Sequence, residues 1–195
     1  MTFRPEDASG RQSLARALSR YAARWPEETD PGLFMSLLDD PADPFVRARL
    51  DGHFTGSAWL VDRTGRRVLL THHRKLERWL QLGGHADGDV ELARVALREA
   101  EEESGLQDLE VEPDPFDVDR HWIPARGDVP GHWHYDVRYV VRAGEDERFV
   151  VSEESLDLAW CDIAALAADA ATDASMARMA RKWLARQAGP AGPAG

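Results

Sequence analysis

The sequence predicts an α/β sandwich around a mixed β-sheet, preceded by a helical extension. Apolar residues recur at helical spacing in residues 9–25, short strand-like runs begin at residue 57, and helical patterns lie between and after those runs. Strands interleaved with helices bury their apolar faces in stacked layers. We therefore expect a helical extension at 1–50, one domain at 51–188 and a disordered tail at 189–195.

The extension is predicted to contain three helical segments. Leu14, Leu18 and Tyr21 lie on one face of the first, over residues 9–25. Pro31 suits a first helical position and predicts a second helix over DPGLFMSLLDD. A third short segment is expected at PFVRARL, residues 44–50. The apolar stripe of the first helix suggests a homodimer contact.

The remaining elements follow from apolar runs separated by turn residues, and from helical spacing. The predicted strands are 57–62, 67–73, 77–82, 116–123, 132–142 and 156–160. The predicted helices of the domain are about 91–104, 161–170 and 172–187. A glycine-rich loop, GGHADGD (83–89), precedes the first of these helices.

Composition excludes several classes of protein. The net charge of −11 argues against a nucleic-acid-binding surface, which is basic. The sequence has no apolar run of the ~18 residues that span a membrane, and its first residues do not resemble a signal peptide. The single Cys161 excludes an internal disulfide. We expect a cytoplasmic protein with no nucleic-acid or membrane partner.

Residues 98–106, REAEEESGL, place four carboxylates near a predicted helix end. Glu99, Glu102 and Glu103 fall within an arc of about 100° on one face, whereas Glu101 points elsewhere. Like charges at this spacing repel by about 0.2–0.5 kcal/mol per pair, and they oppose the helix dipole. A solvated acidic face is one interpretation, and a site for hard divalent cations is the other. The bracketing glycines favour the cation site.

Residues 84–106, GHADGDVELARVALREAEEESGL, resemble the Nudix box. That pattern is a glycine, five residues, a glutamate, seven residues, Arg-Glu, an aliphatic residue, any residue, Glu-Glu, any residue, glycine and an aliphatic residue. Val90 stands at the early glutamate and Ala100 at the bulky aliphatic position. The positions that match are Gly84, Arg98, Glu99, Glu102, Glu103, Gly105 and Leu106.

The resemblance implies a Nudix-type α/β/α sandwich and a Mg²⁺- or Mn²⁺-dependent pyrophosphohydrolase. Its substrate would be a nucleoside diphosphate linked to another moiety, such as a nucleotide sugar, an ADP-ribose-like compound or a nucleoside triphosphate. By position, Glu99, Glu102 and Glu103 would be metal ligands, Glu102 and Glu103 catalytic, and Arg98 would orient one carboxylate. A non-catalytic nucleotide-sensing module is the alternative.

A general base often lies outside the box in this family. Glu153 and Glu154, before LDLAW, are the candidates by resemblance, and Glu154 is the better positional match. Exposed loop acids are the other interpretation of both residues.

The strand HWHYDVR places His132, His134 and Asp136 on one face, where His121 of the preceding strand could oppose them. This face is interpreted as a polar surface without a role or as a substrate contact. A weaker alternative is a zinc-dependent hydrolase that uses His121, His132 and His134. The expected substrate-binding residues are Arg78, Gly84, His85, His132 and His134. For His85 an ordinary surface histidine, and for Arg78 a surface ion pair, are the alternatives.

Overall fold

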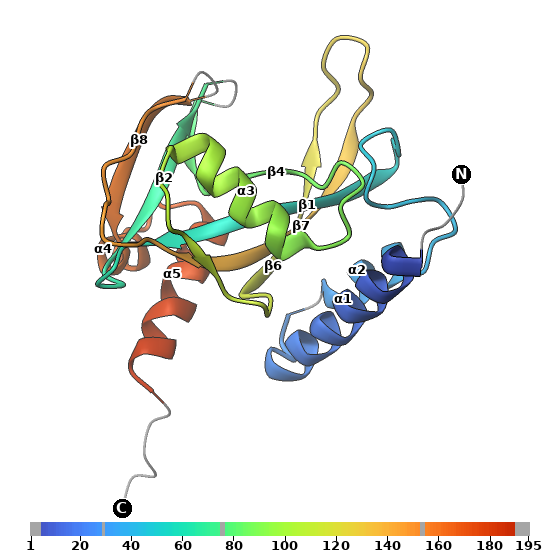
Figure 1. Ribbon diagram of the computed structural model, residues 1–195, viewed down its shortest axis with the longest axis horizontal. Coiled ribbons are helices and arrows are strands. Elements are labelled where there is room, and N and C mark those ends of the chain that lie inside the picture. The colour runs from blue at the N-terminus through green and yellow to red at the C-terminus, as the bar shows by residue number, and fades with distance from the viewer. Residues whose placement is uncertain (1–4, 29, 75–76, 153–154, 190–195) are drawn as a thin grey trace, which may run out of the picture.

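The computed structural model describes residues 5–28, 30–74, 77–152 and 155–189 (Figure 1). Within these residues no helix is long and apolar enough to cross a membrane. In chain order the elements are α1 (Pro5–Arg24), α2 (Pro31–Leu38), β1 (Gly52–Val61), β2 (Arg67–His73), β3 (Arg78–Leu80), β4 (Leu82–His85), α3 (Leu92–Ser104), β5 (Glu110–Val111), β6 (Asp117–Ile123), β7 (His132–Arg142), β8 (Ser155–Asp162), α4 (Ile163–Ala168) and α5 (Ala174–Gln187).

Strand β1 lies at the centre of a mixed sheet. It pairs in parallel with β7 along its whole length, from Gly52↔Trp133 to Val61↔Arg142, and antiparallel with β4 and β2. Strand β7 also pairs with β6 and β5, and β8 pairs with β2. Every residue of β1 is buried, as expected for a strand covered on both faces.

Helices cover both faces of the sheet (Figure 1). Helix α3 packs so closely on β1 that a Cβ added to Gly56 would lie 3.0 Å from Val95. On the other face, Trp183 of α5 packs in one apolar cluster with Trp59 of β1. Successive strand residues point to opposite faces, so β1 supplies apolar residues to both layers. The predicted α/β sandwich is therefore confirmed.

Several elements differ from the prediction. Strand β1 begins at Gly52 and not at residue 57, and the strand predicted at 77–82 is two strands, β3 and β4. Residues 44–50 form turns and not a helix. This segment instead packs the buried Phe45 ring into the core, while its backbone bonds to neighbouring segments, with Gly88 N–H donating to Phe45 C=O. Gly83 and Gly84, expected in a loop, belong to β4. In these places tertiary contacts, which local spacing does not report, decide the conformation.

The apolar stripe of α1 is covered within the chain. Leu14, Leu18 and Tyr21 are buried in one cluster with Phe34 of α2 and Phe54 of β1. The observation that suggested a homodimer contact therefore no longer favours one.

Buried charges hold α5 and β7 around Asp117 of β6, whose side chain is fully buried. Asp117 accepts hydrogen bonds from Arg138 at 3.1 Å, Arg178 at 2.6 Å and Lys182 at 2.6 Å. Lys182 also donates to the Tyr21 hydroxyl at 2.5 Å, which extends the network to α1. Burial alone would raise the pKa of Asp117, but the hydrogen bond from Arg178 and the charges of these cations hold it below its usual value.

We predict that Asp117→Asn lowers the free energy of unfolding by about 3–5 kcal/mol at pH 7, because it removes the buried negative charge that Arg138, Arg178 and Lys182 share. Asp114→Asn is the matched control, since the Arg20–Asp114 pair is exposed and such pairs contribute about 0–1 kcal/mol. Urea denaturation of both variants measures the difference. Equal losses in the two variants would contradict a structural role for this network.

Candidate functional site

The candidate site begins on α3, whose carboxylates face the glycines of β4. Glu103 is only 8% exposed, and its Oε1 accepts a hydrogen bond of 2.8 Å from the Gly83 N–H. Glu99 is half-buried and Glu102 is exposed. The three carboxylates therefore differ in exposure: Glu103 is buried against the sheet, and Glu102 lies in solvent.

Because Gly84 has no side chain, the Glu99 carboxylate can occupy the space beside it. A Cβ at this position would lie 2.4 Å from Glu99 Oε2, well inside contact distance. Arg98 holds the same carboxylate from the other side, with Nη2 donating to Glu99 Oε1 at 3.0 Å and to His85 C=O at 3.2 Å. The structure thus shows the expected ion pair between Arg98 and one carboxylate.

Gly105 ends α3 as the sequence predicts. Its φ of 70° is left-handed, and its N–H donates to Glu101 C=O at 2.8 Å. Leu106 is then buried against the core. The acidic C-terminal part of α3 is therefore held in two places. Strand β4 contacts it at Gly83 and Gly84, and Gly105 ends the helix.

A second group of polar side chains lies on the sheet face opposite α3. Asp136 of β7 is buried at its centre and accepts hydrogen bonds from Ser57 at 2.7 Å and Thr55 at 2.9 Å. Gln81 at 3.2 Å and Arg138 at 2.8 Å complete its partners. Four donors on one carboxylate make Asp136 a structural anion that orients its neighbours.

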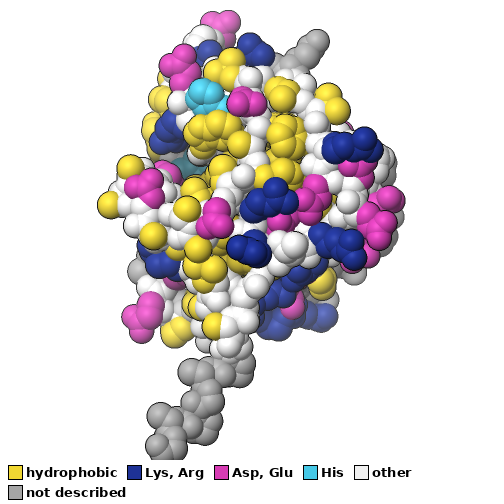
Figure 2. All heavy atoms as spheres, turned by 90° about the vertical axis from the view of Figure 1, so that its left-hand side faces the viewer, with side chains coloured by type: hydrophobic (Ala, Val, Ile, Leu, Met, Phe, Trp, Pro, Cys, Tyr) yellow, Lys and Arg dark blue, Asp and Glu magenta, His cyan; other side chains and the backbone are white. Residues whose placement is uncertain are grey.

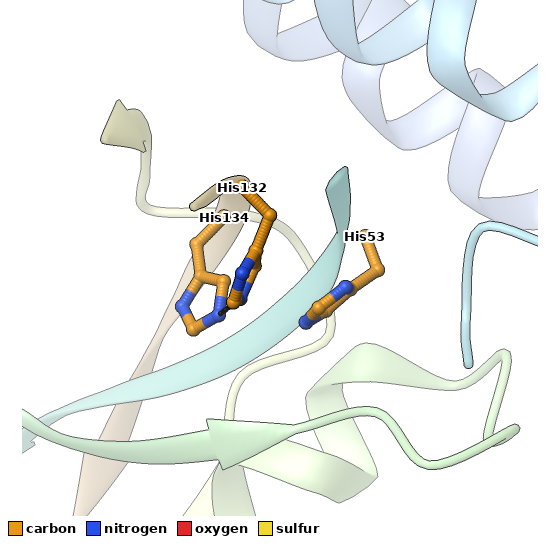
Figure 3. Close-up of side chains that lie close together, drawn as sticks. All are labelled: His53, His132 and His134. Carbon is orange, nitrogen blue, oxygen red and sulfur yellow. Dashed lines mark hydrogen bonds between the residues drawn. The ribbon is translucent and has the colours of Figure 1, made fainter. Parts of the chain in front are cut away.

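Five histidines continue this face beyond Asp136; they are His53, His85, His121, His132 and His134. Their neighbouring rings lie with centroids 5.0–5.5 Å apart. The imidazoles of His53, His132 and His134 point toward one another, with one nitrogen from each within 4.8 Å of the others (Figure 3).

His121 stands outside this three-histidine group. It faces His134 across the β6–β7 pair, as the sequence predicts. Its Nδ1, however, lies 3.4 Å from Asp119 Oδ2. The set predicted for a zinc site therefore needs a correction: the structure groups His53, and not His121, with His132 and His134.

Burial keeps several of these imidazoles neutral at pH 7. Desolvation, with further contributions from neighbouring histidines, lowers the pKa of His134 to about 2. Desolvation and the charge of Arg47 lower the pKa of His85 to about 4. The pKa of His53 is also lowered, mainly by desolvation. Neutral imidazoles can act as acceptors or metal ligands.

The remaining predicted site residues are His85, Arg78, Glu153 and Glu154. His85 lies on β4 opposite Thr55, beside the histidine group. Arg78 is exposed on β3, opposite His73, and no contact in the described ranges links it to the carboxylates. Figure 2 views the side of the molecule that carries β8, where basic side chains lie among acidic and hydrophobic ones. Glu153 and Glu154 lie outside the described residues.

The sequence prediction missed His53 and the hydroxyls that bind Asp136. A signal was present, because His53, Thr55 and Ser57 alternate along DGHFTGS with the period of a strand face. Two glycines and few apolar residues weakened the strand pattern there. Gln81 carried no such signal, since its donation to Asp136 depends on how β3 and β4 meet.

The fold and the glycine-anchored acidic helix define an α/β protein with a carboxylate platform at the sheet. The chain belongs to the NUDIX domain family, whose model matches residues 53–183. The structure is also similar to a NUDIX-family hydrolase from Clostridium perfringens, with a TM-score of 0.54 and 24% identity over 67% of this chain and 95% of that one.

Two further solved structures share the fold. An Ap4A hydrolase binary complex from C. elegans has a TM-score of 0.55 and 20% identity, covering 70% of this chain and 98% of that one. The E. coli dihydroneopterin triphosphate pyrophosphohydrolase has a TM-score of 0.52 and 16% identity, covering 66% and 92%. A comparison with curated proteins gave no match.

We predict that metal-free protein loses stability as the pH falls from 7 to 5. An unfolded histidine has a pKa near 6.5, whereas folded His134 has one of about 2, so below pH 6.5 protons bind preferentially to the unfolded chain. This linkage costs about 2 kcal/mol at pH 5 for one such histidine. Urea unfolding in EDTA should show a smaller pH dependence in His134→Gln than in the wild type. An identical dependence would contradict the burial argument.

Proposed function

We propose that the chain is a Mg²⁺- or Mn²⁺-dependent pyrophosphohydrolase that cleaves a nucleoside diphosphate linked to another moiety. One observation carries the proposal: two carboxylates of α3 meet the glycines of β4, since Glu103 accepts a hydrogen bond from the Gly83 N–H and Glu99 fills the place of a side chain at Gly84. The family supports a hydrolase acting on pyrophosphate bonds. The similar structures named for Ap4A and for dihydroneopterin triphosphate support a phosphate-containing small molecule as the substrate.

The α3 residues fit a hard divalent cation. Glu99, Glu102 and Glu103 offer oxygen ligands, which Mg²⁺ and Mn²⁺ prefer. A bound divalent cation supplies charge neutralisation for the diphosphate and lowers the pKa of an attacking water. These three residues are the ligands we propose, and Glu102 and Glu103 are proposed as catalytic.

The chain's own contacts organise this ligand set. The Gly83 N–H fixes one Glu103 oxygen at 2.8 Å. Arg98 fixes Glu99 at 3.0 Å and ties it to the backbone of β4 through His85 C=O. Because like charges on one helix face repel, these contacts hold two of the three carboxylates in place before a cation binds. Glu102 remains in solvent, where a substrate can reach it.

The proposal also assigns roles to residues outside α3. Glu154, or else Glu153, is proposed as the general base that takes the proton of the attacking water. His85, His132 and His134 are proposed to face the substrate, because they continue the polar sheet face beside β4. Arg78 would attract an anionic substrate from the surface.

We predict that Glu102→Gln lowers turnover by about 100-fold or more, since a bound cation contributes several kcal/mol to transition-state stabilisation. Phosphatase-coupled phosphate release should be measured with Mg²⁺ or Mn²⁺ across nucleotide sugars, dinucleoside polyphosphates and nucleoside triphosphates.

Glu101→Gln is the matched control for Glu102→Gln. Its position is nearly opposite the shared face of the helix, so turnover should stay close to that of the wild type. Unchanged turnover in Glu102→Gln would contradict the proposal. Calorimetric nucleotide binding without product formation would favour the sensing module.

We predict that Gly84→Ala weakens Mn²⁺ binding by about 10-fold with little change in stability. The three atoms nearest to the new Cβ all belong to the flexible carboxylate end of Glu99, so the carboxylate moves and the fold remains. Gly32→Ala is the control, because a Cβ there meets no atom within 4 Å. Mn²⁺ titration by electron paramagnetic resonance and thermal unfolding measure the two effects. Wild-type Mn²⁺ affinity in Gly84→Ala would show that Glu99 is not a ligand.

A further inference from the structure

We infer that His53, His132 and His134 form a second metal site, which takes a borderline divalent ion of the Zn²⁺ class. These residues lie on the sheet face opposite α3, so the site is separate from the α3 carboxylates. Imidazole nitrogens suit Zn²⁺, Co²⁺, Ni²⁺ and Cu²⁺, whereas Mg²⁺ prefers oxygen ligands. The two sites would therefore select different ions.

Backbone carbonyls set the tautomers of two of the histidines. His53 Nδ1 lies 3.1 Å from Arg49 C=O, and His132 Nδ1 lies 2.9 Å from Pro130 C=O. A carbonyl only accepts, so each Nδ1 carries the proton and each Nε2 is left with a lone pair. Metal-binding histidines are commonly held in this way, by a hydrogen bond from the ring nitrogen that does not bind the ion.

The ring nitrogens are directed into the group, and the one on His53 lacks a partner. His53 is 1% exposed, and within the described residues its Nε2 has no hydrogen-bond partner. A buried polar atom left unpaired costs about 1–3 kcal/mol, so a ligand for this nitrogen is expected. With its proton on Nδ1, His132 accepts at Nε2 a hydrogen bond of 3.2 Å from His134 Nε2–H, which an ion bound to both rings would replace (Figure 3).

The spacing is close to that required by a tetrahedral ion. Two nitrogens that each bind Zn²⁺ at about 2.0–2.1 Å are about 3.3 Å apart. The His132–His134 pair already has this separation, and one nitrogen from each of the three residues lies within 4.8 Å of the others. Small rotations of the His53 ring would close the remaining distance. Three imidazoles leave a further position for water or another ligand.

The surroundings permit a cation to enter. His134, His85 and His121 are half-buried, so the group opens to solvent on their side. The nearby positive charge of Arg47 is paired with Asp87, whose Oδ1 accepts from Arg47 Nε at 2.6 Å.

The test uses Co²⁺ as a visible probe in the EDTA-treated 195-residue protein. One equivalent of Co²⁺ should produce visible d–d absorption bands, which equimolar Zn²⁺ abolishes and millimolar Mg²⁺ leaves unchanged. His134→Gln and His132→Gln should weaken Co²⁺ binding by about 100-fold or more, since losing even an outer hydrogen-bond partner of a ligand costs about 10–100-fold. Circular dichroism checks that each variant is folded.

Two control variants test whether the ion binds the histidines or the carboxylates of α3. His72→Gln removes a histidine outside the group, one that stacks on Trp79, and Glu102→Gln removes a carboxylate of α3. Both should keep the Co²⁺ bands. The absence of bands in the wild type, or their retention in folded His134→Gln, would overturn the inference. Loss of the bands in Glu102→Gln would also overturn it, by assigning the ion to α3.

A variant-independent readout is proton magnetic resonance of wild-type protein with Co²⁺. The Nδ1 protons of His53 and His132 are held by carbonyls, so they should appear as strongly shifted, slowly exchanging signals. If bound Co²⁺ shifts no histidine signal, the inference is wrong. A failure here leaves the Mg²⁺- or Mn²⁺-dependent hydrolysis untouched, because that is measured separately through Glu102.

Discussion

The register between β6 and β7 is the constraint on which much of the molecule depends. It places Asp117 opposite Arg138, Asp119 opposite Asp136 and His121 opposite His134. Because one face of both strands carries these side chains, a slip of one residue would turn every charge into the opposite layer. The hydrogen bonds of Arg138 to Asp117 and Asp136 make such a slip costly, since each buried charge would lose its partner.

The sheet face opposite α3 is divided along its strands into three zones. Trp59 and Val140 lie in the apolar zone, covered by Trp183 of α5. The charged zone follows, where Arg178 and Lys182 reach down from the same helix to Asp117. The histidines come last, and within the described residues no hydrogen bond, ion pair or ring contact joins them directly to α5; Arg178 donates to Asp119, which lies beside His121. One helix therefore stabilises the sheet by two means, hydrophobic burial and ion pairing, and leaves the final zone open to a ligand.

Much of this fold follows from local sequence signals, and the exceptions have physical causes. The spacing of Glu99, Glu102 and Glu103 predicts their shared face, and Gly105 predicts the helix end. The contact between Glu99 and Gly84 was not predictable in detail, because it depends on how α3 crosses β4. His53 was missed because its strand, rich in glycine and hydroxyl residues, owes its stability to pairing with β7 and not to its own composition.

Strand β4 connects the two ligand sets. Successive residues of a strand point to opposite faces, so Gly84 faces α3 while Gly83 and His85 face the polar side. The backbone N–H of Gly83 holds Glu103, the open face of Gly84 admits Glu99, and the His85 ring lies 5.2 Å from that of His53. This short strand, with glycine at two of its four positions, thus has carboxylates on one face and imidazoles on the other. The same backbone therefore forms part of both ligand sets.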